Sequence, residues 1–208
     1  LTLKETEKIL LEMKVSRNLS LREVFEAKNL AQVNEYIENK TKDAELSKDL
    51  ILFLHKMLIN NINDDIAGRF RKAGEYVRVG SYIAVAPEGI EPMMDDILHE
   101  YSTDISTFPI DKIAKFHLDF ESIHPFIDGN GRIGRVIINY QLARIGFPNI
   151  IVRNKGKNKY YKALRDYNYN ENTKGMGKII ALNVIESLHK RISYLKGQSI
   201  ITLSQYVK

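Results

Sequence analysis

The fold of this chain is decided by residues 124–135, which read His124-Pro125-Phe126-Ile127-Asp128-Gly129-Asn130-Gly131-Arg132-Ile133-Gly134-Arg135. The segment before them has apolar residues at helical spacing, Ile113, Phe116, Phe120 and Ile123. This helix is expected to stop at Pro125, because proline disfavours helical geometry in the residue before it. A second helix is predicted from about Arg132 to Ile145, with Gly146 as its stop signal. Residues 124–135 are therefore predicted to form a loop between two central helices.

The second half of this loop suits a polyphosphate. Gly129 and Gly131 bracket Asn130 at the expected helix start, where successive backbone N–H groups form an anion site. Arg132 and Arg135 are three residues apart and share a helix face. Their planar guanidinium groups pair well with phosphate oxygens.

A metal ligand and a base complete the set. Asp128 is the only carboxylate in the loop, and beside a polyphosphate it would hold Mg²⁺, which needs few protein ligands there. His124 is the loop residue that takes up a proton near neutral pH. Each residue also has a structural alternative, since Gly-Asn-Gly is a common turn and Asp128 could cap a helix. Their coincidence favours attack on a phosphorus atom, with Phe126 as the core anchor of the loop.

Helical signals dominate the remainder of the chain and predict one all-α domain. Capping boxes begin at Thr2 and Ser20, and a helix is expected from Ser47 to about Asn60. Further helices are predicted at 91–101, 160–167 and 178–195. We divide the domain into N-terminal helices (1–60), a core (61–196) and a C-terminal tail (197–208).

The exception to the helical pattern lies between Glu75 and Ala86. Strand-forming residues flank Gly80-Ser81, which supplies a two-residue hairpin turn. Such a hairpin has an outer edge that could accept another extended segment. A surface hairpin that binds no other segment fits the sequence equally well.

Composition narrows the class of protein. The net charge is +5 and the pI about 9.2, with basic residues gathered between Arg153 and Lys178. A solvated basic face is favoured over an anionic ligand there. The chain has no cysteine, no apolar run near the ~20 residues of a membrane span and no signal-peptide pattern. A cytoplasmic protein that does not enter a membrane is the simplest expectation.

Residues 124–135 resemble the Fic family signature, His-Pro-Phe-x-(Asp/Glu)-Gly-Asn-Gly-Arg-x-x-Arg, with every defined position filled. The likeness extends from the hairpin at 75–86 through Tyr160-Tyr161-Lys162-Ala163-Leu164. It implies the Fic fold, a helical bundle with one β-hairpin called the flap. It also implies a protein adenylyltransferase, which moves AMP from ATP to a Ser, Thr or Tyr hydroxyl of a protein and releases pyrophosphate.

The resemblance assigns roles by motif position. His124 would be the general base and Asp128 would hold Mg²⁺. ATP would be bound by Phe126, Gly129, Asn130, Gly131, Arg132, Arg135, Tyr161 and Asn168. Tyr160 and Tyr167 have the same spacing as Tyr161 and Asn168 and leave that part of the assignment open. The flap, formed by Val79, Gly80, Ser81, Tyr82 and Ile83, would dock the target segment by strand addition.

Many Fic proteins carry an inhibitory helix with the pattern (Ser/Thr)-x-x-x-Glu-(Gly/Asn), which does not occur here; Thr41 to Glu45 comes closest. Since Leu1-Thr2-Leu3 resembles the segment that follows such a helix, we expect the chain to begin just downstream of one. Removal of AMP, transfer of another nucleotide and, remotely, a basic nucleic-acid-binding module remain as alternatives. Self-modification and a homodimer are compatible with the sequence, which does not name the target protein.

Overall fold

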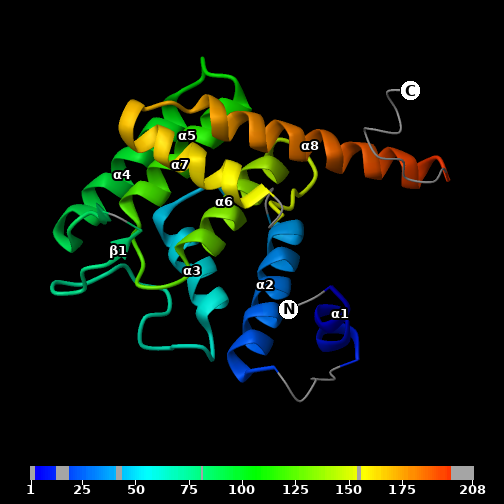
Figure 1. Ribbon diagram of the computed structural model, residues 1–208, viewed down its shortest axis with the longest axis horizontal. Coiled ribbons are helices and arrows are strands. Elements are labelled where there is room, and N and C mark those ends of the chain that lie inside the picture. Colours follow the sequence, from blue (N-terminus) through cyan, green and yellow to red (C-terminus); the bar gives the residue numbers. More distant parts are fainter. Residues whose placement is uncertain (1–2, 13–18, 41–43, 81, 154–155, 198–208) are drawn as a thin grey trace.

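The computed structural model describes residues 3–12, 19–40, 44–80, 82–153 and 156–197. Within these ranges the chain forms eight helices and one short hairpin (Figure 1). The helices are α1 (Leu3–Leu11), α2 (Leu21–Lys40), α3 (Lys48–Ile59), α4 (Pro87–Thr103), α5 (Pro109–Ile123), α6 (Asn130–Arg144), α7 (Lys157–Asn170) and α8 (Lys174–Leu195). The all-α class with one hairpin is confirmed.

Two helices begin with the caps that the sequence predicts. The Ser20 N–H and hydroxyl both donate to Glu23 Oε2, at 3.0 and 2.8 Å, and thereby form the capping box of α2. The Ser47 hydroxyl accepts the Leu50 N–H at 3.2 Å and caps α3. Thr2, the first predicted cap, lies outside the described residues. These caps are local in sequence, which makes them predictable.

Helix α4 begins four residues before the predicted start at Glu91 and ends at Thr103. Pro87 occupies its first turn, where the missing N–H would have no helical partner. Pro92 lies inside the helix and removes one backbone hydrogen bond without ending it. The predicted helix, 91–101, is shorter than α4 by four residues at its start and by two at its end.

The hairpin is shorter than the predicted 75–86 segment. Strands β1 (Arg78–Val79) and β2 (Tyr82–Ile83) pair antiparallel, and the Ala84 N–H donates to the Val77 carbonyl at 3.0 Å. Gly80 has a φ of 59°, the left-handed conformation that the turn requires. Ser81 lies outside the described residues. Beyond Val77 the ladder stops because Arg71, described below, binds the flanking carbonyl groups.

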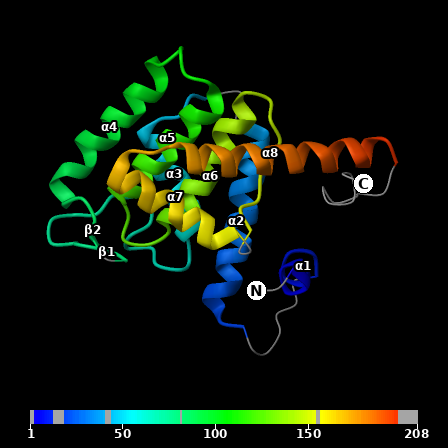
Figure 2. The ribbon, with the colours of Figure 1, turned by 45° about the horizontal axis from the view of Figure 1, so that its top comes forward.

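Helix α5 is central to the molecule and packs against α4, α6, α7 and α8 (Figures 1 and 2). It shares one buried cluster with α2, α3, α4 and α6, and a second with α6, α7 and α8. The C-terminal half of α8 extends beyond the helical body in both views. No helix in the described ranges is long and apolar enough to cross a membrane. The α5–α6 loop joins the two helices that both clusters share, and its Phe126 belongs to the first cluster.

Candidate functional site

His124 ends helix α5 in a left-handed conformation, with φ 53° and ψ 59°. Its N–H donates to the Phe120 carbonyl at 3.0 Å, and its own carbonyl accepts from Arg71 Nε at 3.0 Å. A histidine in this region of backbone space is strained unless its surroundings hold it there. Arg71 also donates its backbone N–H to the Pro125 carbonyl at 2.9 Å, so it fixes the first turn of the loop.

Arg71 joins the loop to the hairpin. Its buried guanidinium donates to the carbonyl groups of Glu75 at 3.0 Å and Val85 at 2.6 Å, the two ends of the hairpin base. It also reaches the carbonyls of Ile123 and His124 on α5. Burial lowers the pKa of this group from its usual value. Sequence reasoning did not find Arg71, because nothing in the sequence links it to a histidine 53 residues away.

Phe126 is fully buried and anchors the loop, as predicted. Its ring stacks on His55, with ring centroids 3.7 Å apart, and also contacts Phe70. The Asn130 side chain closes the loop by accepting the Phe126 N–H at 2.9 Å and donating to the Phe126 carbonyl at 2.7 Å. The Phe126 ring is thus packed against His55 and Phe70, and the Asn130 amide is engaged within the loop.

His55 of α3 contacts the loop through Phe126 and Asp128, and it was not identified from the sequence. Its Nδ1 accepts the Gly68 N–H at 3.0 Å, so Nε2 carries the proton and donates to the Asp128 carbonyl at 3.0 Å. Burial lowers the pKa of His55 to about 4 and keeps it neutral. A histidine among the buried residues of α3 is the one signal that could have pointed to it.

The His124 side chain is 17% exposed. Its Nδ1 is buried and lies 4.0 Å from Glu121 Oε2. Burial lowers the pKa of His124, and the charge of Arg71 acts in the same direction, against the raising effect of the Glu121 carbonyl. The imidazole is therefore neutral at pH 7 and able to accept a proton.

A buried polar cluster lies behind His124. Burial raises the pKa of Glu121 to about 7, although Arg135 and Tyr160 oppose the shift. His117 lies one turn earlier on α5, and its Nε2 is 2.7 Å from the Tyr160 hydroxyl. Burial lowers the pKa of His117 to about 3. Gly134 makes room for this cluster, since a Cβ there would lie 2.7 Å from Glu121 Oε1.

The expected phosphate-binding residues share one end of α6. Gly129 caps this helix with a φ of 87°, and its N–H donates to Asp128 Oδ1 at 2.6 Å. Arg132 and Arg135 both line a cavity of about 290 Å³ between α6, α2 and residues 150–152. The predicted common face of the two arginines is confirmed. Gly131 lies beside them, with Arg135 Nη1 3.3 Å from the position of a Cβ.

Asp128 carries the loop's carboxylate. Burial acts to raise its pKa, but Arg132 and Arg22 outweigh it and hold the pKa below its usual value. The ionised side chain is 35% exposed, which suits a hard cation that takes its remaining ligands from phosphates and water. Among the described residues, no three acidic, histidine or cysteine side chains form a metal-binding group. The residues present therefore fit Mg²⁺ only in company with a bound nucleotide.

Helix α7 presents its tyrosines in two directions. Tyr160 faces inward to His117, and Tyr167 donates to Asp119 of α5. Tyr161 is 46% exposed, with Lys157 Nζ 5.6 Å from its ring centroid. Asn168 lies two turns later, is exposed, and accepts from the Ser122 hydroxyl at 2.8 Å. Of the two pairs, Tyr161 and Asn168 thus combine the predicted spacing with an exposed position, whereas the hydroxyl groups of Tyr160 and Tyr167 are bound to side chains of α5.

Two of the flap residues, Gly80 and Ile83, are exposed, and Val79 is half-buried. Val79 pairs with Tyr82 in the hairpin, and Ile83 is 65% exposed. Arg71 ties the hairpin to His124, so the histidine and the hairpin are held by the same side chain. Each strand of this two-stranded hairpin has one neighbour within the described residues, so its other side is a sheet edge.

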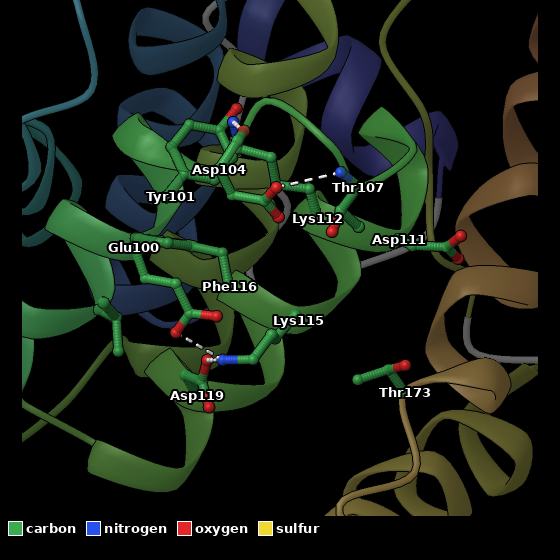
Figure 3. Close-up of a pocket in the computed structure, with 11 residues that line it drawn as sticks. Glu100, Tyr101, Asp104, Thr107, Asp111, Lys112, Lys115, Phe116, Asp119 and Thr173 are labelled. Carbon is green, nitrogen blue, oxygen red and sulfur yellow. Dashed lines mark hydrogen bonds and ion pairs between the residues drawn. The ribbon is translucent and has the colours of Figure 1, made fainter.

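A second cavity of about 300 Å³ lies between α4, α5 and Thr173 at the start of α8 (Figure 3). Lys115 bridges Glu100 and Asp119 there, at 2.8 and 2.9 Å. Its lining includes none of residues 124–135. This cavity is separate from the candidate site.

Fold and site together define a helical domain in which one loop joins a neutral histidine, His124, to a helix start capped by Gly129. Residues 45–142 match the Fic/DOC family. The chain is 32% identical over 158 residues to "Protein adenylyltransferase fic-1" of Caenorhabditis elegans, covering 74% of this chain and 30% of that protein. The chain therefore belongs, through residues 45–142, to the Fic/DOC family, and it spans less than a third of the length of this relative.

Solved structures agree on the fold. A Fic domain containing signaling protein from Bacteroides thetaiotaomicron superposes with a TM-score of 0.84 at 24% identity, over 97% of this chain and 83% of that one. Residues 134–508 of Fic-1 from C. elegans superpose with a TM-score of 0.82 at 28% identity, over 96% of this chain and 60% of that one. The fold is the Fic fold.

Proposed function

We propose that this chain is a protein adenylyltransferase, which transfers AMP from ATP to a hydroxyl group of a target protein. The observation that carries the proposal is the α5–α6 loop, where a neutral His124 and the anion-binding start of α6 stand at opposite ends. The names of its curated relatives support the same activity. The proposal assigns to this chain the adenylyltransferase activity that appears in the names of those longer proteins.

His124 acts as the general base in this proposal. Its Nδ1 faces Glu121, which leaves Nε2 to accept the proton of the target hydroxyl. The hydroxyl oxygen bonds to the α-phosphorus while the bond from that phosphorus to its bridging oxygen breaks. Pyrophosphate leaves, with its charge balanced by Arg132 and Arg135.

The remaining loop residues bind and orient ATP. Gly129 and Gly131 let the backbone N–H groups approach the phosphates, and Asn130 and Phe126 keep the loop in shape through the contacts described above. Asp128 would hold Mg²⁺, which when bound neutralises charge on the polyphosphate. Tyr161 and Asn168 would border the adenosine.

The flap, residues 79–83, would align the target by strand addition, which brings a target hydroxyl toward His124 because Arg71 couples the two. A cytoplasmic location, a homodimer and modification of the chain itself remain predictions from the sequence. AMP removal and transfer of another nucleotide use the same loop and are outcomes of the experiment below.

The test is incubation of the chain with Mg²⁺ and ATP labelled at the α-phosphate, with a lysate as the source of targets. We expect label and the mass of one AMP group on protein, and a loss of at least ~10²-fold in rate in His124→Ala. ATP labelled at the γ-phosphate separates this reaction from phosphorylation, because AMP transfer leaves that label in pyrophosphate. Transfer of γ-label, or equal labelling by His124→Ala, would refute the proposal.

A further inference from the structure

One face of α2 is turned toward the α5–α6 loop. It carries Arg22, Glu26, Leu30 and Asn34, which follow one another at intervals of four residues. Leu30 and Asn34 line the cavity beside the motif arginines. Arg22 and Glu26, nearer the start of α2, contact side chains of the loop directly. A helix more than 80 residues upstream in the sequence therefore contributes to the candidate site.

Four charged side chains form a closed ring across this contact. Glu26 Oε1 lies 3.1 Å from Arg22 Nε and 2.9 Å from Arg132 Nη1. Asp128 closes the ring, with Oδ1 3.1 Å from Arg132 Nη2 and Oδ2 2.5 Å from Arg22 Nη2. Positive and negative groups alternate, so each guanidinium contacts two carboxylates.

The two halves of the ring differ in exposure. The Arg132 side chain is 19% exposed, and Glu26 is 32% exposed. The Arg22 side chain is 57% exposed and rests on the outer oxygen of Asp128. An exposed ion pair contributes little and is screened by salt, so the pair that includes Arg22 is the easier one to exchange. The contact between Glu26 and Arg132 is therefore the more sheltered part of the ring, and the contact between Arg22 and Asp128 is the more exposed part.

We infer that α2 supplies two positioning residues to the nucleotide site: Glu26 orients Arg132, and Arg22 is the counter-ion of Asp128, exchanged for a divalent cation when nucleotide binds. This inference rests on the proposed function. Arg22 donates to Asp128 Oδ2, whereas Gly129 and Arg132 both donate to Oδ1, so displacement of the exposed Arg22 would free Oδ2 for a cation. Without a metal, Arg22 shields an incoming polyphosphate from the negative charge of Asp128.

The inference predicts how nucleotide affinity depends on metal. The measured quantity is the ratio of dissociation constants without and with Mg²⁺, obtained by calorimetry with the unreactive analogue adenosine 5′-(α,β-methylene)triphosphate. In Arg22→Gln, Asp128 repels the metal-free nucleotide and is free for the cation, so the ratio should rise on the order of three- to fivefold. Arg22→Lys restores a charge and should return part of the effect.

Glu26→Gln tests the other half of the ring. Loss of its charge releases Arg132 without exposing Asp128, so affinity should fall by a similar factor with and without Mg²⁺. The ratio then stays at the wild-type value. If α2 had a purely structural role, Arg22→Gln and Glu26→Gln would not differ in this way, with one changing the ratio and the other changing only the affinity. Thermal melting of each variant confirms that it is folded.

Two controls isolate the ring. Arg153 forms a comparably exposed pair with Glu186, with side chains 50% and 37% exposed, so Arg153→Gln should leave the ratio unchanged. In an Asp128→Asn background, Arg22→Gln should have no further effect on the ratio, because the charge that it balances is gone.

The outcomes separate this inference from the proposed function. If the wild type binds the analogue but the ratio is the same in Arg22→Gln, the counter-ion role is wrong while the function stands. If affinity in Glu26→Gln equals that of the wild type, its positioning role is wrong. If the wild type binds no nucleotide with or without Mg²⁺, the proposed function fails and this inference fails with it.

Discussion

Among the carboxylates Glu26, Glu121 and Asp128 around the loop, Glu121 has the most buried side chain. It is 7% exposed and lies against Gly134 and His124. Burial raises its pKa from 4.5 to about 7, so the native protein binds a proton there that the unfolded chain releases. A group whose pKa is raised in the folded state contributes stability below its unfolded pKa and loses it as pH rises to the folded value.

The neutral form of Glu121 is therefore favourable below pH 4.5, and its contribution is lost between pH 4.5 and 7. We expect Glu121→Gln to gain stability relative to the wild type across that window, by roughly 3 kcal/mol at most. Thermal melts at several pH values measure the difference, and the exposed Glu88→Gln serves as the control. A difference between Glu121→Gln and the wild type that is constant with pH would show that burial does not shift this carboxyl group.

Gly134 supports a second prediction at the level of single residues. A Cβ at this position would lie 2.7 Å from Glu121 Oε1 and 2.9 Å from His117 Cε1, and both side chains are buried. Gly134→Ala should therefore destabilise the protein by about 1–3 kcal/mol, measured as a shift in the urea midpoint. Gly156→Ala meets no atom within 4 Å and should leave the midpoint nearly unchanged. Equal midpoints for Gly134→Ala and the wild type would mean that the cluster can move aside.

Among the elements, the hairpin depends on one side chain. Arg71 binds the carbonyl groups at both ends of its base and also holds His124. Replacement by glutamine leaves several of these groups without a partner, at a cost on the order of 3 kcal/mol. We expect Arg71→Gln to speed amide hydrogen exchange across residues 76–84, while α8 keeps its protection.

The neighbouring Lys72→Gln is the control, because the Lys72 side chain is exposed. If exchange in residues 76–84 were as slow in Arg71→Gln as in the wild type, the hairpin would hold its place without Arg71. A uniform acceleration over the whole chain would indicate global destabilisation instead.

The same element shows what the sequence can predict. Helix caps such as Ser20 and Ser47 act within three residues, and the α5–α6 loop concentrates its polar groups in one short segment, so both are visible in the sequence. The hairpin was visible too, but not its length, because Arg71 ends the ladder through contacts that sequence spacing does not encode. The pairing of α2 with Asp128 joins residues 106 positions apart and needed the structure.

The whole molecule is built so that its two buried clusters share helices. Side chains of α5 and α6 belong to both clusters, and Tyr101 packs against each of them. Loss of one cluster would expose the faces of α5 and α6 that the other needs. Chemical unfolding should therefore be a single transition, with coincident midpoints by far-UV circular dichroism and by tyrosine fluorescence. Two separate midpoints would show that the clusters unfold independently.

The meeting of α5 and α6 at one short loop has a further consequence for the electric field there. The C-terminus of α5 carries partial negative charge, and the N-terminus of α6 carries partial positive charge. A proton arriving at His124 and an anion arriving at Gly129 are each favoured by the helix end that they approach. The loop is thus polarised along its own length, and a substrate with an acidic hydrogen at one end and negative charge at the other has one preferred direction in which to lie.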